Sequence, residues 1–245
     1  MTAPTLAIDA KSLHKRYGAK TAVEDVSLAV HPGEVLGVLG TNGAGKTTTV
    51  EMIAGLRRPD RGSVKILGLD PQQDRTKVRQ LLGVQLQQAV LHSALTVDEL
   101  IGLYRTFYPS PRPAEELLEL VGLREQRRVR FEKLSGGQQQ RLSIALALAG
   151  RPRVVILDEL TTGLDPRARR QMWKTIERLV EENVTILLVS HAMEEVERLC
   201  DRIALIDAGR VIALDTPAGL VARSGAKNLD EAFVALTGKE LEDAE

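Results

Sequence analysis

The residues best suited to chemistry in this sequence form a short glycine-rich loop, G-T-N-G-A-G-K-T-T, at residues 40–48. Glycines let a backbone turn its N–H groups toward phosphate oxygens, and a helix that follows the loop adds its positive N-terminal end. Lys46 is placed to reach the β- and γ-phosphates of a nucleotide, and the Thr47 hydroxyl is a candidate ligand of Mg²⁺. The residues expected to bind the nucleotide here are Gly40, Thr41, Asn42, Gly43, Ala44, Gly45, Lys46, Thr47 and Thr48.

An Asp-Glu pair at the end of an apolar run supplies further candidates. Val154–Leu157 predicts a buried strand, and Asp158, directly after it, is suited to a second contact with the magnesium. Period-two alternation would turn Glu159 away from Asp158 and toward an attacking water, as general base or water-positioner. An adjacent acidic pair is usually a solvated loop end, but the strand before it and the loop at 40–48 favour a catalytic interpretation.

The segment L-S-G-G-Q at residues 134–138 has the features of a second anion site. Ser135, Gly136 and Gly137 open a predicted helix over Gln138–Ala149, so free backbone N–H groups gather there. Ser135 is equally a good N-cap, and alone the segment would be an ordinary helix start. Because the loop at 40–48 already accounts for one set of phosphates, a second site is useful if it closes over ATP bound to a partner subunit.

Two further motifs follow the loop at 40–48 and L-S-G-G-Q along the chain: V-V-I-L-D-E at 154–159 and V-S-H at 189–191. These four motifs and their order resemble the nucleotide-binding domains of ABC transporters, and the resemblance covers about residues 5–225. The resemblance implies that Tyr17 stacks on adenine and that His191 contacts the γ-phosphate. It implies that Gln87 contacts Mg²⁺ and senses the transport partner. Gln85 and Gln88 lie close by, so the choice of Gln87 rests on the resemblance.

The same resemblance implies contacts between two copies of the chain. Gly163–Leu164–Asp165 looks like the segment that touches the opposite subunit, so Asp165 joins the candidate site residues together with Gln138. Thr41 and Leu160 stand where the family usually has proline. Neither replaces a group that acts on phosphate, so we expect the chain to hydrolyse ATP, with Lys46 among its catalytic residues.

The expected fold class is α/β, because buried strands alternate with helices in the second half of the chain. Strands are expected at Leu6–Asp9, Val26–Val30, Val35–Leu39, Val154–Leu157, Thr185–Ser190 and Ile203–Ile206, and helices at Lys46–Ala54, Leu95–Tyr108, Ala114–Val121, Gln138–Ala149, Pro166–Glu182 and Met193–Cys200. The resemblance adds a P-loop NTPase of ABC type, a RecA-like core with an N-terminal antiparallel β subdomain and an inserted helical subdomain. The core lobe is expected at about 1–82 and 152–225, the helical lobe at about 83–151, and a C-terminal helix at about 228–238.

Composition excludes several classes of function. Lys+Arg and Asp+Glu both number 33 and aromatic residues are 3%, so neither a general basic field nor stacking rings point to nucleic acid. The single cysteine cannot form a disulfide within the chain. No apolar run approaches the roughly 20 residues of a membrane span and no secretory signal is visible, so we expect a soluble protein that another chain holds at any membrane.

Two weaker patterns leave alternatives open. Tyr104, Phe107 and Tyr108 are spaced as one helix face, which favours the helical lobe's own core over a groove for a helix of a membrane subunit. The segment N-L-D-E-A-F-V-A-L-T-G at 228–238 resembles the terminal helix of ABC-2-type export ATPases.

Taken together, these patterns predict the ATP-binding subunit of an ABC transporter, an ATPase that uses ATP and Mg²⁺ and powers export. We expect a head-to-tail homodimer bound to a separate transmembrane permease at the cytoplasmic face of the cell membrane. One alternative is a soluble ABC ATPase that acts on ribosomes or DNA; one ATPase domain without a long coiled coil disfavours it. A kinase or GTPase is a second alternative, disfavoured because no N-K-x-D motif exists and L-S-G-G-Q would be unexplained.

Overall fold

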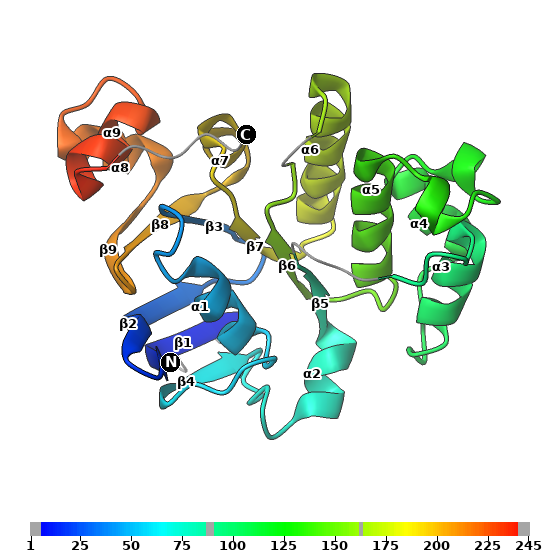
Figure 1. The fold of residues 1–245 in the computed structure, drawn as a ribbon, viewed down its shortest axis with the longest axis horizontal. Helices are drawn as coiled ribbons and strands as arrows, with labels where there is room; N and C mark the ends of the chain where they lie inside the picture. Colours follow the sequence, from blue (N-terminus) through cyan, green and yellow to red (C-terminus); the bar gives the residue numbers. More distant parts are fainter. Residues whose placement is uncertain (1–5, 87–90, 162–163, 240–245) are drawn as a thin grey trace.

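The computed structural model describes residues 6–86, 91–161 and 164–239, and Figure 1 shows the path of the chain. The strands are β1 Ile8–Tyr17, β2 Lys20–Val30, β3 Val35–Leu39, β4 Arg61–Ile66, β5 Leu82–Gln85, β6 Val154–Asp158, β7 Thr185–Val189, β8 Arg202–Asp207 and β9 Arg210–Asp215. The helices are α1 Lys46–Ile53, α2 Arg75–Leu81, α3 Val97–Arg105, α4 Ala114–Leu120, α5 Gly136–Ala147, α6 Pro166–Glu181, α7 Met193–Leu199, α8 Pro217–Ser224 and α9 Leu229–Thr237, with 3₁₀ turns η1 Arg124–Gln126 and η2 Phe131–Lys133.

The strands join in one sheet with the order β4-β1-β2-β9-β8-β3-β7-β6-β5. From β8 to β5 the strands are parallel, and every residue of β3, β6 and β7 is buried. Val189 at the end of β7 pairs with Val38 on one side and with Asp158 on the other. The loops that leave β3, β6 and β7 therefore start side by side at one edge of the sheet, the usual place for a ligand in such folds.

Both faces of the parallel strands are covered, which explains why these strands read as continuous apolar runs. On β6, Val155 and Leu157 belong to a core shared with α5, α6, α7 and the helical lobe. Val154 and Ile156 belong to a second core shared with α1 and the antiparallel strands. The alternation of β6 thus divides the interior into two layers.

The antiparallel strands β4, β1 and β2 form the N-terminal part of the sheet and meet β9, which is antiparallel to β8, through the pair Asp25 and Arg210. β1 is much longer than the strand predicted at Leu6–Asp9. Its register shifts between Ala10 and Arg16, and Ser12 has a φ of 45°. Such bulges interrupt the period-two pattern, so the sequence reveals only the regular start of the strand.

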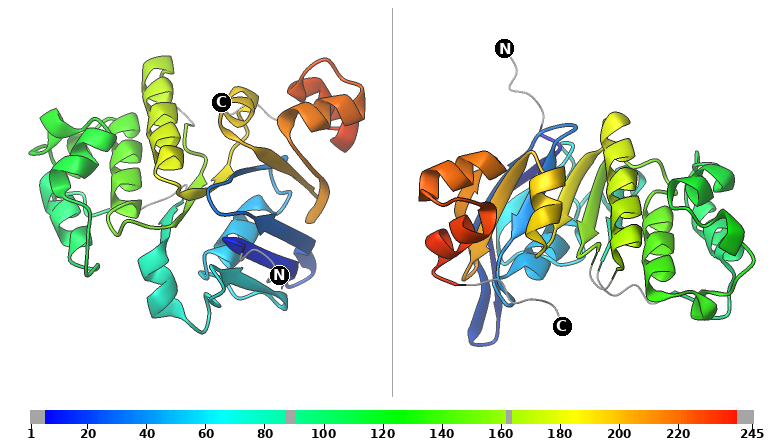
Figure 2. Two further views of the ribbon diagram at one scale, coloured as in Figure 1. Left: turned by 180° about the vertical axis from the view of Figure 1, so that it is seen from behind. Right: turned by 90° about the horizontal axis from the view of Figure 1, so that it is seen from above.

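The helices α3, α4 and α5 gather at one end of the molecule, and α8 and α9 at the other (Figures 1 and 2). Residues 83–85, expected to begin the helical lobe, instead complete β5, the end strand of the core sheet. The sequence did not predict β5, because its four residues L-G-V-Q are too few to show a strand pattern and include a glycine. That glycine is required, because a Cβ at Gly83 would lie 2.4 Å from the carbonyl oxygen of Ala147 on α5.

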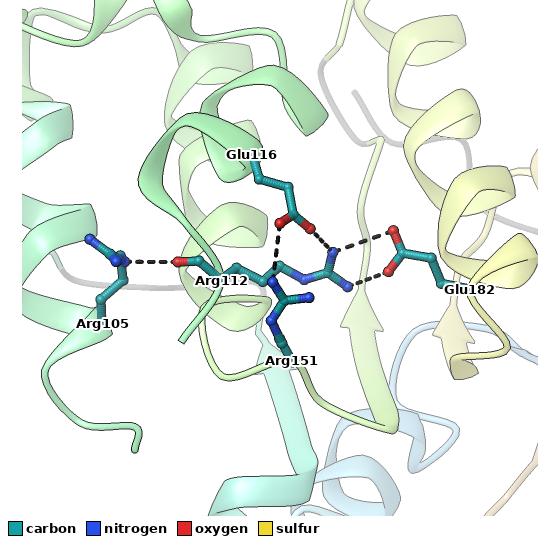
Figure 3. A network of polar contacts seen from close by, with 5 residues as sticks. All are labelled: Arg105, Arg112, Glu116, Arg151 and Glu182. Atoms are coloured by element: carbon teal, nitrogen blue, oxygen red, sulfur yellow. Dashed lines mark hydrogen bonds and ion pairs between the residues drawn. The ribbon is translucent and has the colours of Figure 1, made fainter. Parts of the chain in front are cut away.

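A buried arginine links the helical lobe to the core (Figure 3). Arg112 is only 4% exposed, and its guanidinium binds Glu116 of α4 at 2.5 Å and both carboxylate oxygens of Glu182, the C-cap residue of α6. Arg151 binds the same Glu116 at 3.3 Å, and Arg105 donates to the carbonyl of Arg112 at 2.8 Å. The network joins the segment between α3 and α4 to a core helix 70 residues away.

The C-terminal helices α8 and α9 pack against each other, and Leu220 of α8 and Phe233 of α9 are buried in the hydrophobic core. The single cysteine, Cys200, is free and buried. Within residues 6–86, 91–161 and 164–239, no helix combines the length and the apolar composition that crossing a membrane requires.

Candidate nucleotide-binding site

The glycine-rich loop leaves β3 and enters α1 through a left-handed residue. Gly45, the N-cap of α1, has a φ of 102°, and a Cβ there would lie 2.4 Å from the carbonyl oxygen of Ala22. Only glycine meets both conditions. Since a glycine has no side chain to cap a helix, the amides of the first turn of α1 have no side-chain cap. They provide the N–H groups that a phosphate needs.

Lys46 is held under the loop that precedes it. Its Nζ donates to the carbonyls of Gly40 at 2.7 Å and Thr41 at 3.0 Å, and the residue is 7% exposed. Burial lowers the pKa of Lys46, while the nearby carboxylates of Glu159 and Asp158 oppose that change. An anion placed against this ammonium would add to the stabilisation of its charged form.

A cavity of about 350 Å³, a common size for a small-molecule site, opens beside the N-terminus of α1. It is lined by Tyr17, Lys20, Ala22, Asn42, Gly43, Gly45, Lys46, Thr47, Thr48 and Glu159. Gly40, Thr41 and Ala44 do not line it, because they form the turn behind it, in which Ala44 N donates to Thr41 O at 3.1 Å. Lys20 and Ala22 were not predicted as site residues. Both lie on β2, and no local pattern in the sequence shows that this strand lies beside the loop at 40–48.

Tyr17 lies at the rim of this cavity and is 40% exposed. The guanidinium of Arg57 lies 5.2 Å from its ring centroid and the Lys15 ammonium lies 5.8 Å from it. Cations over an aromatic face are attracted to it, so they hold the ring at the edge of the cavity. The partly exposed ring is available to stack on a flat base.

Asp158 and Glu159 follow β6 but have different surroundings. Asp158 is 2% exposed, and burial, with the nearby charge of Glu159, raises its pKa to about 6. The alternation argument for Glu159 is wrong, because β6 ends at Asp158 and Glu159 has a left-handed φ of 50°. This backbone turn, rather than an extended strand, brings Glu159 into the cavity with its Oε1 3.9 Å from Nδ1 of His191.

The donor set fits a magnesium ion that arrives with a nucleotide. Across the described part of the chain, no three His, Cys, Asp or Glu side chains are arranged to hold a metal ion. Thr47 and Asp158 offer two oxygen ligands, and Mg²⁺ commonly takes one or two protein ligands together with phosphates and water. The uncapped first turn of α1 and the buried Lys46 provide the matching phosphate cradle.

Gln85, a glutamine not predicted as a site residue, contacts Asp158 at the end of β6. Gln85 is 3% exposed, and its Oε1 accepts from the backbone N–H of Asp158 at 3.2 Å. Gln87 lies outside the described residues. The contact of Gln85 depends on the pairing of β5 with β6, so no signal along the chain could have singled it out.

The L-S-G-G-Q segment at residues 134–138, here called the signature segment, lies apart from this cavity. Ser135 and Gln138 form a capping box at the start of α5: the Ser135 Oγ accepts from Gln138 N at 3.3 Å, and Gln138 Oε1 accepts from Ser135 N at 2.9 Å. Ser135 therefore caps α5, as an ordinary N-cap residue does. Ser135 and Gly136 are exposed, and a Cβ at Gly136 would meet no atom within 4 Å. No signature residue lines the cavity beside α1.

Asp165 lies on the same side of the molecule as the signature helix. It caps α6 by accepting from the N–H groups of Arg167 and Ala168 at 2.8 and 2.9 Å, and these backbone hydrogen bonds hold its pKa below the usual value. Asp165 and Arg141 of α5 line one cavity of about 500 Å³. Gly163 lies outside the described residues.

Comparison with known proteins identifies the family. The family model described as ABC transporter matches residues 23–162, more than half of the chain. The chain belongs to the ABC transporter family. This ABC ATPase is 37% identical to the linearmycin resistance ATP-binding protein LnrL of Bacillus subtilis (strain 168), over 93% of this chain and 75% of that protein. It is 41% identical to the Nod factor export ATP-binding protein I of Neorhizobium galegae, over 90% of this chain and 65% of that protein.

Solved structures of ABC ATPases share the fold. An ATP-binding subunit of an ABC transporter superposes with a TM-score of 0.86 at 31% identity, covering 95% of this chain and 99% of that one. A dimeric ATP-binding cassette in a post-hydrolysis state, bound to ADP and Pi, has a TM-score of 0.77 at 27% identity and covers 85% and 98%. CbiO1 of Clostridium perfringens, part of the transporter complex cbiONQ, has a TM-score of 0.77 at 27% identity and covers 89% and 91%.

Membership confirms the predicted fold class, the predicted activity and its cofactors: the ABC ATPase binds ATP with Mg²⁺ and hydrolyses it. It excludes the kinase and the GTPase. The names of the relatives support transport and not an action on ribosomes or DNA.

Proposed function

We propose that this ABC ATPase powers export through a separate permease at the cytoplasmic face of a membrane, as a head-to-tail homodimer. The chain spans 65% to 75% of the length of the two relatives named above, one named for export and the other for resistance. The observation that carries the proposal is the separation of the two anion sites within one chain. The cavity beside α1 contains no signature residue, while the N-terminus of α5 is exposed elsewhere.

A head-to-tail dimer would complete both sites at once. A two-fold axis makes each subunit offer its signature segment to its partner's cavity, so two equivalent ATP sites result. Ser135 and Gly136 would then add N–H groups to the γ-phosphate from outside the chain that holds the nucleotide. Gly137 packs toward Leu164, since a Cβ there would lie 3.0 Å from its side chain, so the signature segment and the Asp165 loop would move as one surface.

Within each site, the residues of this chain have separate roles. The N–H groups of α1 and the Lys46 ammonium would hold the phosphates, and Tyr17 would stack on the adenine. Thr47 and Asp158 would hold Mg²⁺, with Gln87 from outside the described residues. When bound, Mg²⁺ neutralises charge that develops on the phosphate oxygens.

Glu159 would orient the attacking water and accept its proton. Its position in the cavity, 3.9 Å from His191, suits a shared contact with a γ-phosphate and a water. The His191 imidazole would donate to the γ-phosphate. Most of the rate enhancement would then come from positioning and electrostatics, as phosphoryl transfer requires.

The permease would dock beside the end of β5. A small cavity of about 120 Å³ lies there between Leu86, Tyr104 and Tyr108, among other residues. The two tyrosines pack against the lobe's core, as expected, but Phe107 is 60% exposed with its ring 5.7 Å from that of Tyr104. An exposed aromatic beside an apolar cavity is suited to receive a helix of a partner.

The Glu159→Gln variant tests the proposal. It removes the proton acceptor and preserves the shape, so we expect normal ATP binding, a stable dimer in ATP and nearly complete loss of turnover. Titration with a fluorescent ATP analogue measures binding, size-exclusion chromatography with light scattering measures the dimer, and a phosphate-release assay measures turnover. Exposed Glu125→Gln is the matched control. Turnover at the wild-type rate, or a strictly monomeric variant in saturating ATP, would contradict the proposal.

A further inference from the structure

A fully buried carboxyl group lies just outside the nucleotide site. Glu195 on α7 is 0% exposed, and its side chain receives three hydrogen bonds. Ser190 Oγ donates to its Oε2 at 2.7 Å, Trp173 Nε1 donates to its Oε1 at 3.2 Å, and the Thr161 hydroxyl is its third partner. Burial raises the pKa of Glu195, and these three hydrogen bonds oppose the change. An acidic group in this interior costs free energy unless such partners satisfy it.

The three partners come from three segments that lead to reacting groups. Ser190 precedes His191, and its Oγ also accepts from the N–H of Ala192 at 3.0 Å, so one hydroxyl bridges the residues on both sides of His191. Thr161 is two residues beyond Glu159 in the sequence. Trp173 lies on α6, the helix that Asp165 caps.

No other contact in the described residues gives Glu195 an ordinary role in an ion pair. Arg169, the nearby cation, pairs with Glu194 at 3.8 Å, and Arg198 lies over the Trp173 ring and pairs with Glu177. A buried carboxyl group carries a desolvation cost that an apolar side chain of similar size would not, so packing alone does not explain a glutamate here.

We propose that Glu195 is a positioning residue for hydrolysis: it fixes the backbone around His191 relative to the segment that follows Glu159. This inference rests on the role proposed above for His191. A shift of about 1 Å in a group that contacts the reacting phosphate is enough to reduce turnover severely. ATP binding itself depends on the loop at 40–48, which Glu195 does not touch, so affinity should be unaffected.

Replacement by glutamine changes the hydrogen bonds but not the shape. The Trp173 N–H can only donate, so the glutamine must direct its carbonyl oxygen there. Its NH₂ group then faces Ser190, whose proton loses its acceptor. Glu195→Gln should therefore loosen the turn at His191 while α6 and α7 stay packed.

The test compares Glu195→Gln with Glu197→Gln, the same chemical change at an exposed position of the same helix. We expect Glu195→Gln to lower kcat about tenfold to a hundredfold. The Kd for a fluorescent ATP analogue should change by less than about twofold, because the loop at 40–48 is untouched. Glu197→Gln should match the wild type. An unchanged kcat, or an equal loss in kcat and affinity, would overturn the proposal.

A double-mutant cycle with His191→Ala separates positioning from general loosening. If Glu195 acts through His191, Glu195→Gln should lower kcat no further once His191 is alanine. A full multiplicative loss in that background would overturn the proposal. Wild-type turnover by His191→Ala alone would instead refute the role of His191. Should Glu195→Gln not fold, Ser190→Ala takes its place in the same cycle with the same expectations.

Discussion

Asp158→Asn should stabilise the protein while abolishing its activity, and the size of the effect follows from the burial of this carboxylate. Asp158 is 2% exposed and its pKa is raised from 3.8 to about 6, chiefly by desolvation. Because the folded pKa lies above the unfolded one, ionised Asp158 destabilises the fold once the pH exceeds both values. A rise of about two pH units corresponds to about 3 kcal/mol. Asparagine resembles the neutral acid and removes this penalty.

The assay is thermal unfolding in nucleotide-free, magnesium-free buffer between pH 5 and pH 8. For a chain of this size about 3 kcal/mol corresponds to an increase in Tm of roughly 6 to 12 °C at pH 8. The gain should fall to about half near pH 5, because the folded carboxyl is then largely protonated already. The control is Asp165→Asn, for which we expect no gain because backbone hydrogen bonds lower the pKa of Asp165. An Asp158→Asn protein no more stable than wild type at pH 8, or a gain independent of pH, would refute the reasoning.

Three further predictions concern the ion pairs that join the helical lobe to the core, the glycine-rich loop, and the stacking of adenine on Tyr17. Arg112→Met should lower the free energy of unfolding by about 2–3 kcal/mol in chemical denaturation, since it leaves two carboxylates without their shared cation, whereas exposed Arg124→Met should change it by less than about 0.5 kcal/mol. Equal effects of the two would count against the link between lobes. Gly45→Ala should weaken ATP binding by about fivefold to a hundredfold, because alanine at a φ of 102° strains the loop by about 1–3 kcal/mol; unaltered affinity in a fluorescence titration would be inconsistent with that geometry. Tyr17→Ala should raise the Kd for ATP about tenfold while Tyr17→Phe leaves it unchanged, since stacking of a base on an aromatic ring contributes about 1–3 kcal/mol; a similar loss in both variants would argue against stacking.

The parts of the fold that depend on local pattern could be predicted from the sequence. The apolar runs of β3, β6 and β7 lead directly to candidate site residues, and the glycine, lysine and threonine pattern at 40–48 is itself typical of a phosphate-binding loop. The parts that depend on distant contacts could not. Gln85 reaches Asp158 only because β5 pairs with β6, and the bulge at Ser12 hides most of β1.

The candidate site divides in the same way. The sequence names Glu159, but the left-handed backbone that turns it into the cavity contradicts the alternation that suggested its direction. Glu195 carries no motif-level signal, because its partners lie 5, 22 and 34 residues away and meet only when α6, α7 and β7 are packed. Residue type alone does not distinguish it from its exposed neighbours on α7.

Mixing two inactive variants measures most directly whether each reaction centre is shared between two chains. Lys46→Ala disables the cavity beside α1 and leaves the signature segment intact. Gly136→Asp places a negative charge at the signature anion site, where the side chain has open space, and leaves the cavity intact. Each variant alone should be inactive. A mixture should recover about a quarter of wild-type ATP turnover, because half the dimers are mixed and each of those has one complete site of two.

Lys46→Ala mixed with Glu159→Gln is the matched control, because both changes fall in the same half of the site and no complete site can form. We predict recovery in the first mixture and none in the second. Failure of Lys46→Ala and Gly136→Asp to complement, with both folded and mixed dimers detected, would contradict the shared reaction centre.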